Sequence, residues 1–231
     1  MKTAHTRRQR PAANTEAIED YAKTIHALSR REDGPVGTSA LAERLGVSPG
    51  TVTAMLKRMA ELGLVEHRPY HGVELTEAGE RVALEVIRHH RLIEAYLAEA
   101  LGMPWDRVHD EAEVLEHYIS EELEERMAVA LGDPSHDPHG DPIPDRELAV
   151  SGEESVSLAD LEPGESGVFC RVSDADSEML RYLDRLGIHP GAELRLRARE
   201  PFDGPLLIEA DGAEHALGRR VAAAMRVMVG A

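Results

Sequence analysis

Four side chains that could bind a metal ion recur at helical spacing in the middle of the chain. They occupy positions i, i+4, i+7 and i+8 of one predicted helix and are His109, Glu113, Glu116 and His117. At about 100° per residue, all four point to the same side of a helix. His90 and Glu94 lie one turn apart in the preceding predicted helix. The pattern predicts a cation site at the border of a helical core.

The donor types indicate which ion such a site would bind. Carboxylates and imidazoles without a thiolate form a hard donor set, suited to Mn²⁺ or Fe²⁺ and less typical of structural zinc. Carboxylates crowded beside a core are costly without a counter-ion, which favours a bound cation. The alternative is an ordinary solvated acidic face. A second group is interpreted as turn chemistry because it lies in a proline-rich stretch: His136, Asp137, His139 and Asp141.

Two helices must position these donors, one from about 77 to 102 and one from about 106 to 131. Three prolines between 133 and 142 exclude regular structure from the next stretch. After residue 157 the apolar residues alternate with polar ones, which predicts a small β-barrel with one helix at about 177–186.

The first 75 residues carry the pattern of a winged helix-turn-helix. A predicted helix at about 15–31 precedes two short helices, 40–45 and 49–62, which are separated by a break at Gly46. A hairpin is predicted from 64 to 75. In this fold the first turns of the second short helix meet base edges in the major groove. The alternative is a helical pair in some other kind of protein.

Small hydroxyl side chains dominate those first turns, so selectivity should depend on methyl contacts and DNA shape. The basic side chains nearby and in the N-terminal arm would bind phosphates. The candidate DNA contacts are Arg7, Arg8, Arg10, Thr38, Ser48, Pro49, Thr51, Thr53, Lys57, Arg58 and Arg68.

The net charge of −17 argues at first against a nucleic-acid partner. Its distribution reverses that conclusion, because residues 1–70 carry +3, residues 71–150 carry −14 and residues 151–231 carry −6. The positive part is the predicted DNA-binding part, and the acidic part holds the candidate metal ligands. With one cysteine and no apolar run of signal-peptide or membrane-spanning length, we expect a cytoplasmic protein without a membrane partner.

Several stretches together resemble the DtxR/MntR family of metal-dependent transcriptional repressors. They are the winged helix and the runs Arg-His-His-Arg-Leu-Ile-Glu at 88–94, Val-His-Asp-Glu-Ala-Glu-Val-Leu-Glu-His at 108–117 and Asp-Pro-His-Gly-Asp-Pro-Ile-Pro at 137–144. The run Leu-Ala-Asp-Leu-Glu-Pro-Gly-Glu at 158–165 is similar to a FeoA-like, SH3-type barrel. The resemblance covers nearly the whole chain.

The resemblance implies a mainly α protein with a small β part. Residues 1–75 would be a winged helix-turn-helix domain with a basic arm, residues 76–150 a helical metal-binding and dimerisation domain with a proline-rich linker, and residues 151–231 a FeoA/SH3-like β-barrel domain. It also implies a repressor, not an enzyme. A homodimer would bind a palindromic operator of metal-homeostasis genes when divalent metal is present.

By that resemblance the primary, activating site consists of Asp20, Glu113, Glu116 and His117. The ancillary site would use His90, Glu94 and His109, and the best-aligned acid from the barrel is Asp176. Iron-responsive members carry Met and Cys at the positions of Asp20 and Glu113, so the carboxylates imply Mn²⁺. Fe²⁺ is the alternative, and other divalent first-row metals are expected to substitute in vitro.

Two residues depart from the expected pattern. Compact two-domain manganese sensors carry glutamate where Lys23 stands, which implies that their closely spaced metal pair does not form here. Asp20 lies opposite the apolar face of its helix, so it can be a ligand only if that side meets the dimerisation domain. A winged-helix regulator of an organic ligand stays open. A metallohydrolase using Glu113 or Glu116 as general base is disfavoured, because hydrolase motifs are absent.

Overall fold

The computed structural model describes residues 13–32, 34–68, 71–150, 152 and 154–230. Two compact units share the chain. The first unit contains residues up to His90, together with Glu113–Arg126 and Pro144–Ala149. The second unit contains Arg91–Ala112, Met127–Ile143 and the chain from Val150 on.

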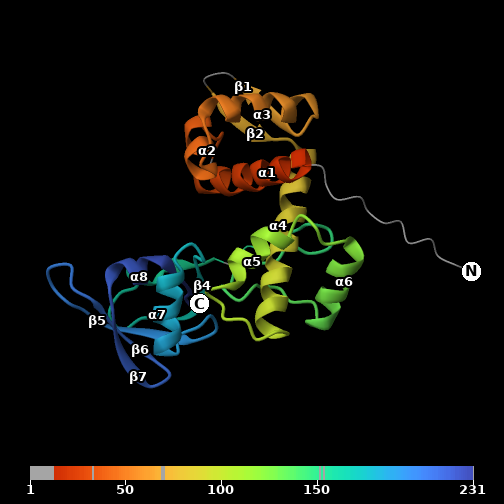
Figure 1. The fold of residues 1–231 in the computed structure, drawn as a ribbon. Helices are drawn as coiled ribbons and strands as arrows, with labels where there is room; N and C mark the ends of the chain where they lie inside the picture. The colour runs from red at the N-terminus through yellow and green to blue at the C-terminus, as the bar shows by residue number, and fades with distance from the viewer. Residues whose placement is uncertain (1–12, 33, 69–70, 151, 153, 231) are drawn as a thin grey trace, which may run out of the picture. The chain divides into compact units, whose positions relative to one another are not determined.

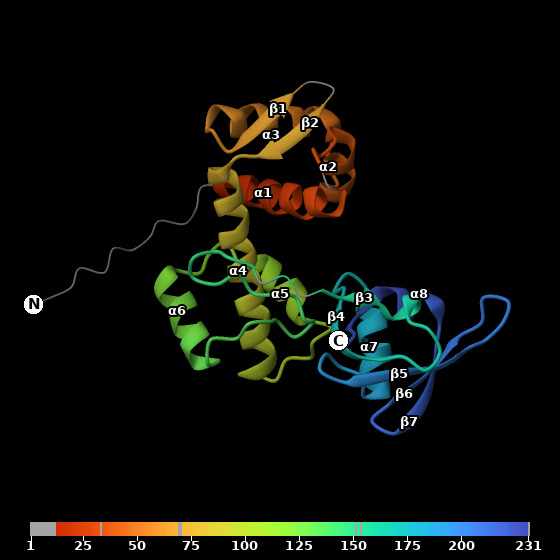
Figure 2. The same ribbon diagram turned by 180° about the vertical axis from the view of Figure 1, so that it is seen from behind.

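The first unit begins with the expected winged helix-turn-helix. Its elements are α1 (Ala13–Glu32), α2 (Thr38–Leu45), α3 (Pro49–Glu61), β1 (Val65–Arg68) and β2 (Gly72–Leu75). The three helices surround a buried apolar cluster that includes Ile25, Leu41 and Leu56. Figure 1 shows α2 joining α1 to α3, and Figure 2 shows the antiparallel pair β1 and β2 beside them.

The turn between α2 and α3 follows from three consecutive signals. Gly46 caps α2 in the left-handed conformation, with φ of 65°, which glycine adopts without strain. The Ser48 hydroxyl accepts a hydrogen bond from the Thr51 amide, and Pro49 occupies the first position of α3. The predicted helix-turn-helix is confirmed, with α2 starting two residues earlier than expected.

The predicted helix from 106 to 131 is wrong in one respect, because the structure divides it. Helix α4 (Glu77–Glu99) is followed by α5 (Val108–Leu115) and α6 (Glu121–Ala130), with a turn between α5 and α6. The Tyr118 amide donates to the Leu115 carbonyl at 2.9 Å, and the Ser120 hydroxyl caps α6 by accepting from the Leu123 amide at 3.2 Å. Leu115 at the end of α5 is 39% exposed, and Leu123 of α6 is 45% exposed.

The second unit contains a six-stranded antiparallel sheet in the order β3-β8-β4-β5-β6-β7. Its elements are β3 (Val156–Ser157), the 3₁₀ turn η1 (Leu158–Asp160), β4 (Ser166–Val172), α7 (Ser177–Leu186), β5 (Glu193–Arg199), β6 (Leu206–Ala210), β7 (Ala213–Leu217), α8 (Arg219–Ala224) and β8 (Met225–Met228). The ribbon of β5, β6 and β7 is clear in Figure 2. This confirms the predicted FeoA/SH3-like fold, while α8 was not predicted.

The core of the sheet domain includes Trp105, which lies much earlier in the chain. Trp105, which precedes α5, is buried in the same apolar cluster as Phe169 of β4 and Leu183 of α7.

Between Asp133 and Pro142, as expected, no helix or strand forms apart from one isolated bridge. Within the described part of the chain, no helix is long and apolar enough to cross a membrane.

Candidate metal centre

Asp20 lies on α1 and is brought to the segment after α5. Its Oδ1 is 3.1 Å from Nε2 of His117. The same nitrogen is 3.7 Å from Oε1 of Glu116, whose side chain is fully buried. Ligand atoms of Asp20, Glu116 and His117 lie within 4.8 Å of one another. The structure thus places three of the four residues expected at the primary site in one group.

Glu113, the fourth, belongs to a neighbouring group that shares Glu116. Ligand atoms of His90, Glu113 and Glu116 also lie within 4.8 Å of one another. The Nδ1 of His90 is hydrogen-bonded to Oε2 of Glu116 and lies 3.7 Å from Oε1 of Glu113. His90 was expected at the ancillary site, and the structure places it beside the primary group as well.

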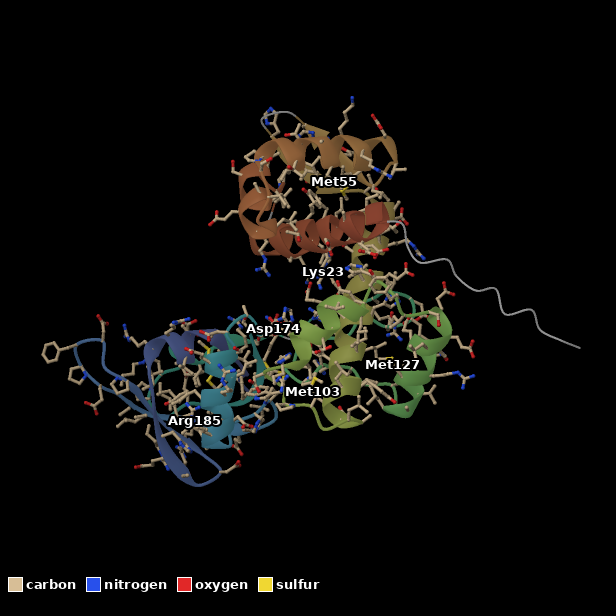
Figure 3. All side chains as sticks on the ribbon, in the orientation of Figure 1. Lys23, Met55, Met103, Met127, Asp174 and Arg185 are labelled. Carbon is tan, nitrogen blue, oxygen red and sulfur yellow. The ribbon has the colours of Figure 1, made fainter. Side chains whose placement is uncertain are left out.

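Lys23 occupies this second group. It lies on α1, on the side away from α3 (Figure 3), and its Nζ donates to Oε1 of Glu113 at 2.6 Å and to Oε2 of Glu116 at 2.8 Å. The same Nζ is 3.2 Å from Nδ1 of His90. Burial alone would lower the pKa of Lys23, but the charges of Glu116 and Glu113 raise it above the usual value. The side chain is therefore a cation at neutral pH.

His117 is also held as a cation, partly by a residue that the sequence did not reveal. Its Nδ1 donates to Oε2 of Glu19 at 2.6 Å. Burial acts to lower the pKa of His117, whereas hydrogen bonds to Asp20 and Glu19 and the charge of Glu116 raise it to about 10. A metal ligand must be neutral imidazole, so a metal ion would displace this proton. Adjacent acids at helical positions 19 and 20 were the only signal for Glu19.

In the second unit, a separate group forms around Glu94. The Nδ1 of His109 is 2.9 Å from Oδ2 of Asp174 and 3.3 Å from Oε1 of Glu94. Hydrogen bonds to Asp174 and Glu94 raise the pKa of His109 to about 10. His90 lies one turn before Glu94 on α4. His90, Glu94 and His109 are the residues expected at the ancillary site, but the acid from the sheet domain is Asp174 in place of Asp176.

The structure places Asp174 in this group and does not bring the expected Asp176 to it. The Asp176 side chain caps α7 by accepting from the Met179 amide at 3.1 Å, and it pairs with Arg220. Asp174 lies two residues earlier and reaches His109 instead. The cap fixes the direction of Asp176, and the loop before it directs Asp174 toward Glu94 and His109.

The proline-rich loop adds a third donor group that we interpreted as turn chemistry. Asp137 does make the expected turn, because its Oδ1 accepts from the amides of His139 at 2.8 Å and Asp141 at 3.0 Å. The structure also buries His139 completely, with Nε2 2.8 Å from the carbonyl of Trp105. Its Nδ1 then lies 3.8 Å from Oε2 of Glu94 and 4.0 Å from Oδ1 of Asp137.

Asp137 and His139 therefore join Glu94 as possible cation ligands, because ligand atoms of the three lie within 4.8 Å of one another. Burial and the charge of Glu94 raise the pKa of Asp137. Nothing in the turn pattern of the sequence indicates that this loop is buried. His136, from the same run, instead contacts the hydroxyl of Ser135 at 2.9 Å.

The donor chemistry fits a hard divalent cation. The primary residues offer carboxylate oxygens and imidazole nitrogens without sulfur, and the buried Glu116 and the exposed Glu113 lie on the same segment as His117. Oxygen-rich sets of this kind suit Mn²⁺ and Fe²⁺. In the chain alone, the positive charge among these carboxylates comes from Lys23 and the protonated His117.

The candidate DNA contacts lie mainly on an exposed surface of the winged helix. Thr38 is half-buried, and Arg68 of the wing is exposed. The candidates on α3 and its cap are all exposed: Ser48, Pro49, Thr51, Thr53, Lys57 and Arg58. The Thr53 hydroxyl donates to the Pro49 carbonyl at 2.9 Å. Arg7, Arg8 and Arg10 lie outside the described residues.

In this chain, the first helix of a winged helix carries one member of a cluster of carboxylates and imidazoles. This arrangement is typical of a metal-responsive DNA-binding protein. Comparisons with known proteins agree. The family model described as iron dependent repressor, N-terminal DNA binding domain, matches residues 14–73. The model of the metal binding and dimerisation domain of these repressors matches 76–145, and that of the FeoA domain matches 156–229.

Individual relatives cover different shares of the chain. The iron-dependent repressor IdeR of Mycobacterium tuberculosis is 38% identical over 147 residues, which is 63% of this chain and 64% of IdeR. The chain thus spans just under two thirds of that curated relative. The diphtheria toxin repressor of Corynebacterium glutamicum is 32% identical over 223 residues, 92% of this chain and 96% of the repressor.

Solved structures are similar over nearly the whole chain. A manganese-dependent transcriptional repressor in complex with manganese is 42% identical, with a TM-score of 0.83 over 92% of this chain and 100% of its own. The chain belongs to the DtxR/MntR family of metal-dependent transcriptional repressors.

Proposed function

We propose that this chain is a metal-dependent transcriptional repressor that responds to Mn²⁺. It would bind a palindromic operator of metal-homeostasis genes as a homodimer. One observation carries the proposal: Asp20 lies on α1 of the winged helix, and its carboxylate meets His117 and Glu116 outside that fold. A ligand set that spans these segments can link metal binding to the position of the DNA-binding helices.

The mechanism depends on how the chain's residues respond to a cation. A bound divalent ion supplies positive charge that four ligands, Asp20, Glu113, Glu116 and His117, can share. Asp20 would then hold α1 to the segment after α5, and His117 would release its proton. DNA affinity rises by the difference in metal affinity between the two states of α1, a coupling of typically about 1–3 kcal/mol.

The choice of Mn²⁺ rests on the oxygen donors at positions 20 and 113. Mn²⁺ binds most weakly among the divalent first-row metals, so a site for it must select by ligand type and geometry. The manganese-dependent repressor with the related structure supports the same choice. The iron-dependent relatives make Fe²⁺ the alternative.

The remaining assignments are part of the same proposal. Glu94 and His109 would form an ancillary site with Asp174, and His90 lies within reach both of these residues and of Glu113 and Glu116. The exposed side chains of α3 and Arg68 would contact DNA, with the N-terminal arginines on phosphates. The chain would divide into the three domains 1–75, 76–150 and 151–231.

The test begins with DNA selected from a random pool in the presence of Mn²⁺. Binding of the selected DNA is then measured with EDTA, Mn²⁺ and anaerobic Fe²⁺. We expect EDTA to abolish binding and Asp20→Ala to remove the metal dependence while leaving a folded dimer. Asp160→Ala, an exposed carboxylate of η1, is the matched control and should bind like the natural chain.

Two outcomes would contradict the proposal. DNA binding that is unaffected by chelation would favour a regulator of an organic ligand. Activation by Fe²⁺ at lower free concentration than Mn²⁺ would overturn the manganese assignment.

A further inference from the structure

The ring of His139 is held by Trp105, which lies 34 positions earlier in the chain. The Nε2 of His139 is 2.8 Å from the Trp105 carbonyl oxygen. Because a carbonyl oxygen can only accept a hydrogen bond, Nε2 must carry a proton. The indole and the imidazole are also stacked, with ring centroids 5.8 Å apart and an interplanar angle of 18°. Trp105 thus contacts His139 through both its backbone and its side chain.

These contacts direct the other nitrogen of His139 toward two carboxylates. Its Nδ1 lies 3.8 Å from Oε2 of Glu94 and 4.0 Å from Oδ1 of Asp137, which is beyond hydrogen-bond distance. Among the described residues, this buried nitrogen has no hydrogen-bond partner. Two ligands that lie about 2.1 Å from one ion are at most about 4.2 Å apart. Both distances therefore fit a cation shared between Nδ1 and the carboxylates.

The backbone of His139 is fixed against β4. Its carbonyl accepts a hydrogen bond from the Val172 amide at 3.0 Å. Gly140 has a φ of 86°, and a Cβ at this position would lie 1.8 Å from the Cys170 carbonyl oxygen. Since the main chain is held, the remaining freedom of His139 is rotation of its side chain, which the stacked indole restricts.

Trp105 is in turn held by the core of the sheet domain. It is 8% exposed and packs in the same cluster as Phe169 and Leu183. Its ring also contacts that of His189, with centroids 5.0 Å apart. In the part of the chain that the structure describes, the buried indole Nε1 has no hydrogen-bond partner. Packing rather than hydrogen bonding orients this ring, so a phenyl ring should be able to replace it.

We propose that Trp105 is a positioning residue of the ancillary metal group. It fixes the rotamer of His139 and keeps a proton on Nε2, so that Nδ1 is the nitrogen that binds a cation at Glu94. The inference rests on the proposed function, because it assumes that a divalent ion binds at Glu94. Residues that orient a metal ligand from behind typically contribute about 10- to 100-fold to metal affinity. Because Trp105 belongs to the sheet-domain core, it also connects the bound ion to the packing of that domain.

The first test uses the fluorescence of Trp105, the single tryptophan of the chain. A paramagnetic Mn²⁺ ion on Nδ1 of His139 should quench it. The Asp20→Ala variant lacks a primary ligand and should show the same quenching as the natural chain. His139→Gln should shift the quenching to Mn²⁺ concentrations at least about tenfold higher. His136→Gln changes a histidine of the same loop that contacts Ser135 instead, and this matched control should leave the titration unchanged.

The second test compares two substitutions of Trp105 in the Asp20→Ala background, with bound Mn²⁺ measured by EPR. Trp105→Phe keeps a flat ring that can stack on His139, and we expect it to keep the Mn²⁺ affinity. Trp105→Leu keeps an apolar side chain without a ring, and we expect its affinity to fall by about 10- to 100-fold. Equal affinities of the two variants would show that Trp105 is only a core residue.

A third measurement decides the question in the natural chain if Trp105→Leu does not fold. NMR of the histidine nitrogens in the Zn²⁺-loaded chain should show His139 with a proton on Nε2 and with Zn²⁺ on Nδ1. The signal is assigned by its loss in His139→Gln. Zn²⁺ bound through Nε2 would break the contact with the Trp105 carbonyl and overturn the inference.

Failure of this inference is distinguishable from failure of the proposed function. If the Trp105 fluorescence does not respond to Mn²⁺ while DNA binding still depends on metal and on Asp20, the positioning role is wrong and the repressor proposal stands. If DNA binding is independent of metal while His139 binds Zn²⁺ through Nδ1, the repressor proposal is wrong and the role of Trp105 stands.

Discussion

His117 connects metal binding to proton release at the scale of a single residue. In the chain alone its two nitrogens contact Glu19 and Asp20, and these contacts raise its pKa to about 10. At neutral pH the ring therefore carries a proton on each nitrogen. A metal ion that binds Nε2 must remove one proton from the ring, so proton and metal compete for the same atom.

We predict that Mn²⁺ affinity rises with pH. Without metal, His117 keeps its second proton at every pH below about 10. Because Mn²⁺ must displace that proton, the Mn²⁺ affinity should rise by about tenfold for each pH unit near neutrality. Titration calorimetry in buffers of different ionisation enthalpy measures the number of protons released. His109→Ala removes a histidine of the ancillary group whose pKa is also raised to about 10, so the protons released there can be subtracted.

Glu19→Gln provides a second check, because it removes one of the two acids that raise the pKa of His117. The variant should release fewer protons near neutral pH and show a weaker pH dependence. Metal affinity that does not change with pH would contradict the assignment of His117 as a ligand.

At the scale of elements, α6 is anchored to α4 by a buried ion pair network. Glu124 of α6 accepts hydrogen bonds from Arg88 and His89 of α4, the latter at 3.0 Å. Burial would raise the pKa of Glu124, but these bonds lower it below its usual value, and Glu124 raises the pKa of His89 against the effect of burial. His89 also contacts the carbonyl of Glu116, so the anchor supports the metal centre.

The direction of both shifts defines the pH range of this anchor. A lowered pKa at Glu124 gives stability that is present above its unfolded pKa and lost as the pH falls. A raised pKa at His89 gives stability that is present below its unfolded pKa and lost as the pH rises through the folded value.

We predict that Glu124→Gln lowers the free energy of unfolding by about 3 kcal/mol, as removal of one partner of a buried pair does.

Urea unfolding at about pH 6, between the two transitions, measures this loss. Glu122→Gln, whose partner Arg126 lies one turn away on the exposed face of the same helix, is the matched control. Its cost should be about 0.3–0.5 kcal/mol. Equal losses for the two variants would show that α6 is not anchored through Glu124.

The elements with strong local signals could be predicted from the sequence. Gly46, Ser48 and Pro49 fix the ends of α2 and α3, and α7 has the predicted bounds. The break between α5 and α6 was missed because apolar residues keep helical spacing across it. Only the cap at Ser120 marks it locally. Caps are short signals that a long periodic pattern easily hides.

The site was predictable where ligands follow one another on one helix, and less so elsewhere. Glu113, Glu116 and His117 came from spacing, whereas Asp20 came from the resemblance alone. Asp174 and Asp176 differ by two residues in a loop, and only the cap of α7 and the pair with Arg220 decide between them. The contact of Lys23 with Glu113 spans 90 residues, which no local pattern can reveal.

For the whole molecule, the distribution of charge and apolar surface indicates how two copies would act together. Residues 1–70 carry a net charge of +3, and the acidic middle of the chain supplies most of the candidate ligands. Four apolar side chains between residues 114 and 123 are exposed by 39% to 63% in the single chain: Val114, Leu115, Tyr118 and Leu123. Exposed apolar residues this close together in the sequence are candidates for a protein contact. The matching family model describes this region as part of a dimerisation domain.

We predict that Val114→Arg weakens the dimer by about 10- to 100-fold, because a two-fold interface would bury two copies of the new charge. Sedimentation equilibrium measures the change in the dimer dissociation constant. Operator affinity should fall with dimer concentration, since a palindrome requires two DNA-binding domains at a fixed spacing. Val229→Arg, an equally simple change at an exposed valine near the end of β8, is the control and should leave the dimer intact. A dimer that tolerates Val114→Arg would place the interface elsewhere on the chain, while intact Mn²⁺ binding by a monomeric variant would separate metal binding from dimerisation.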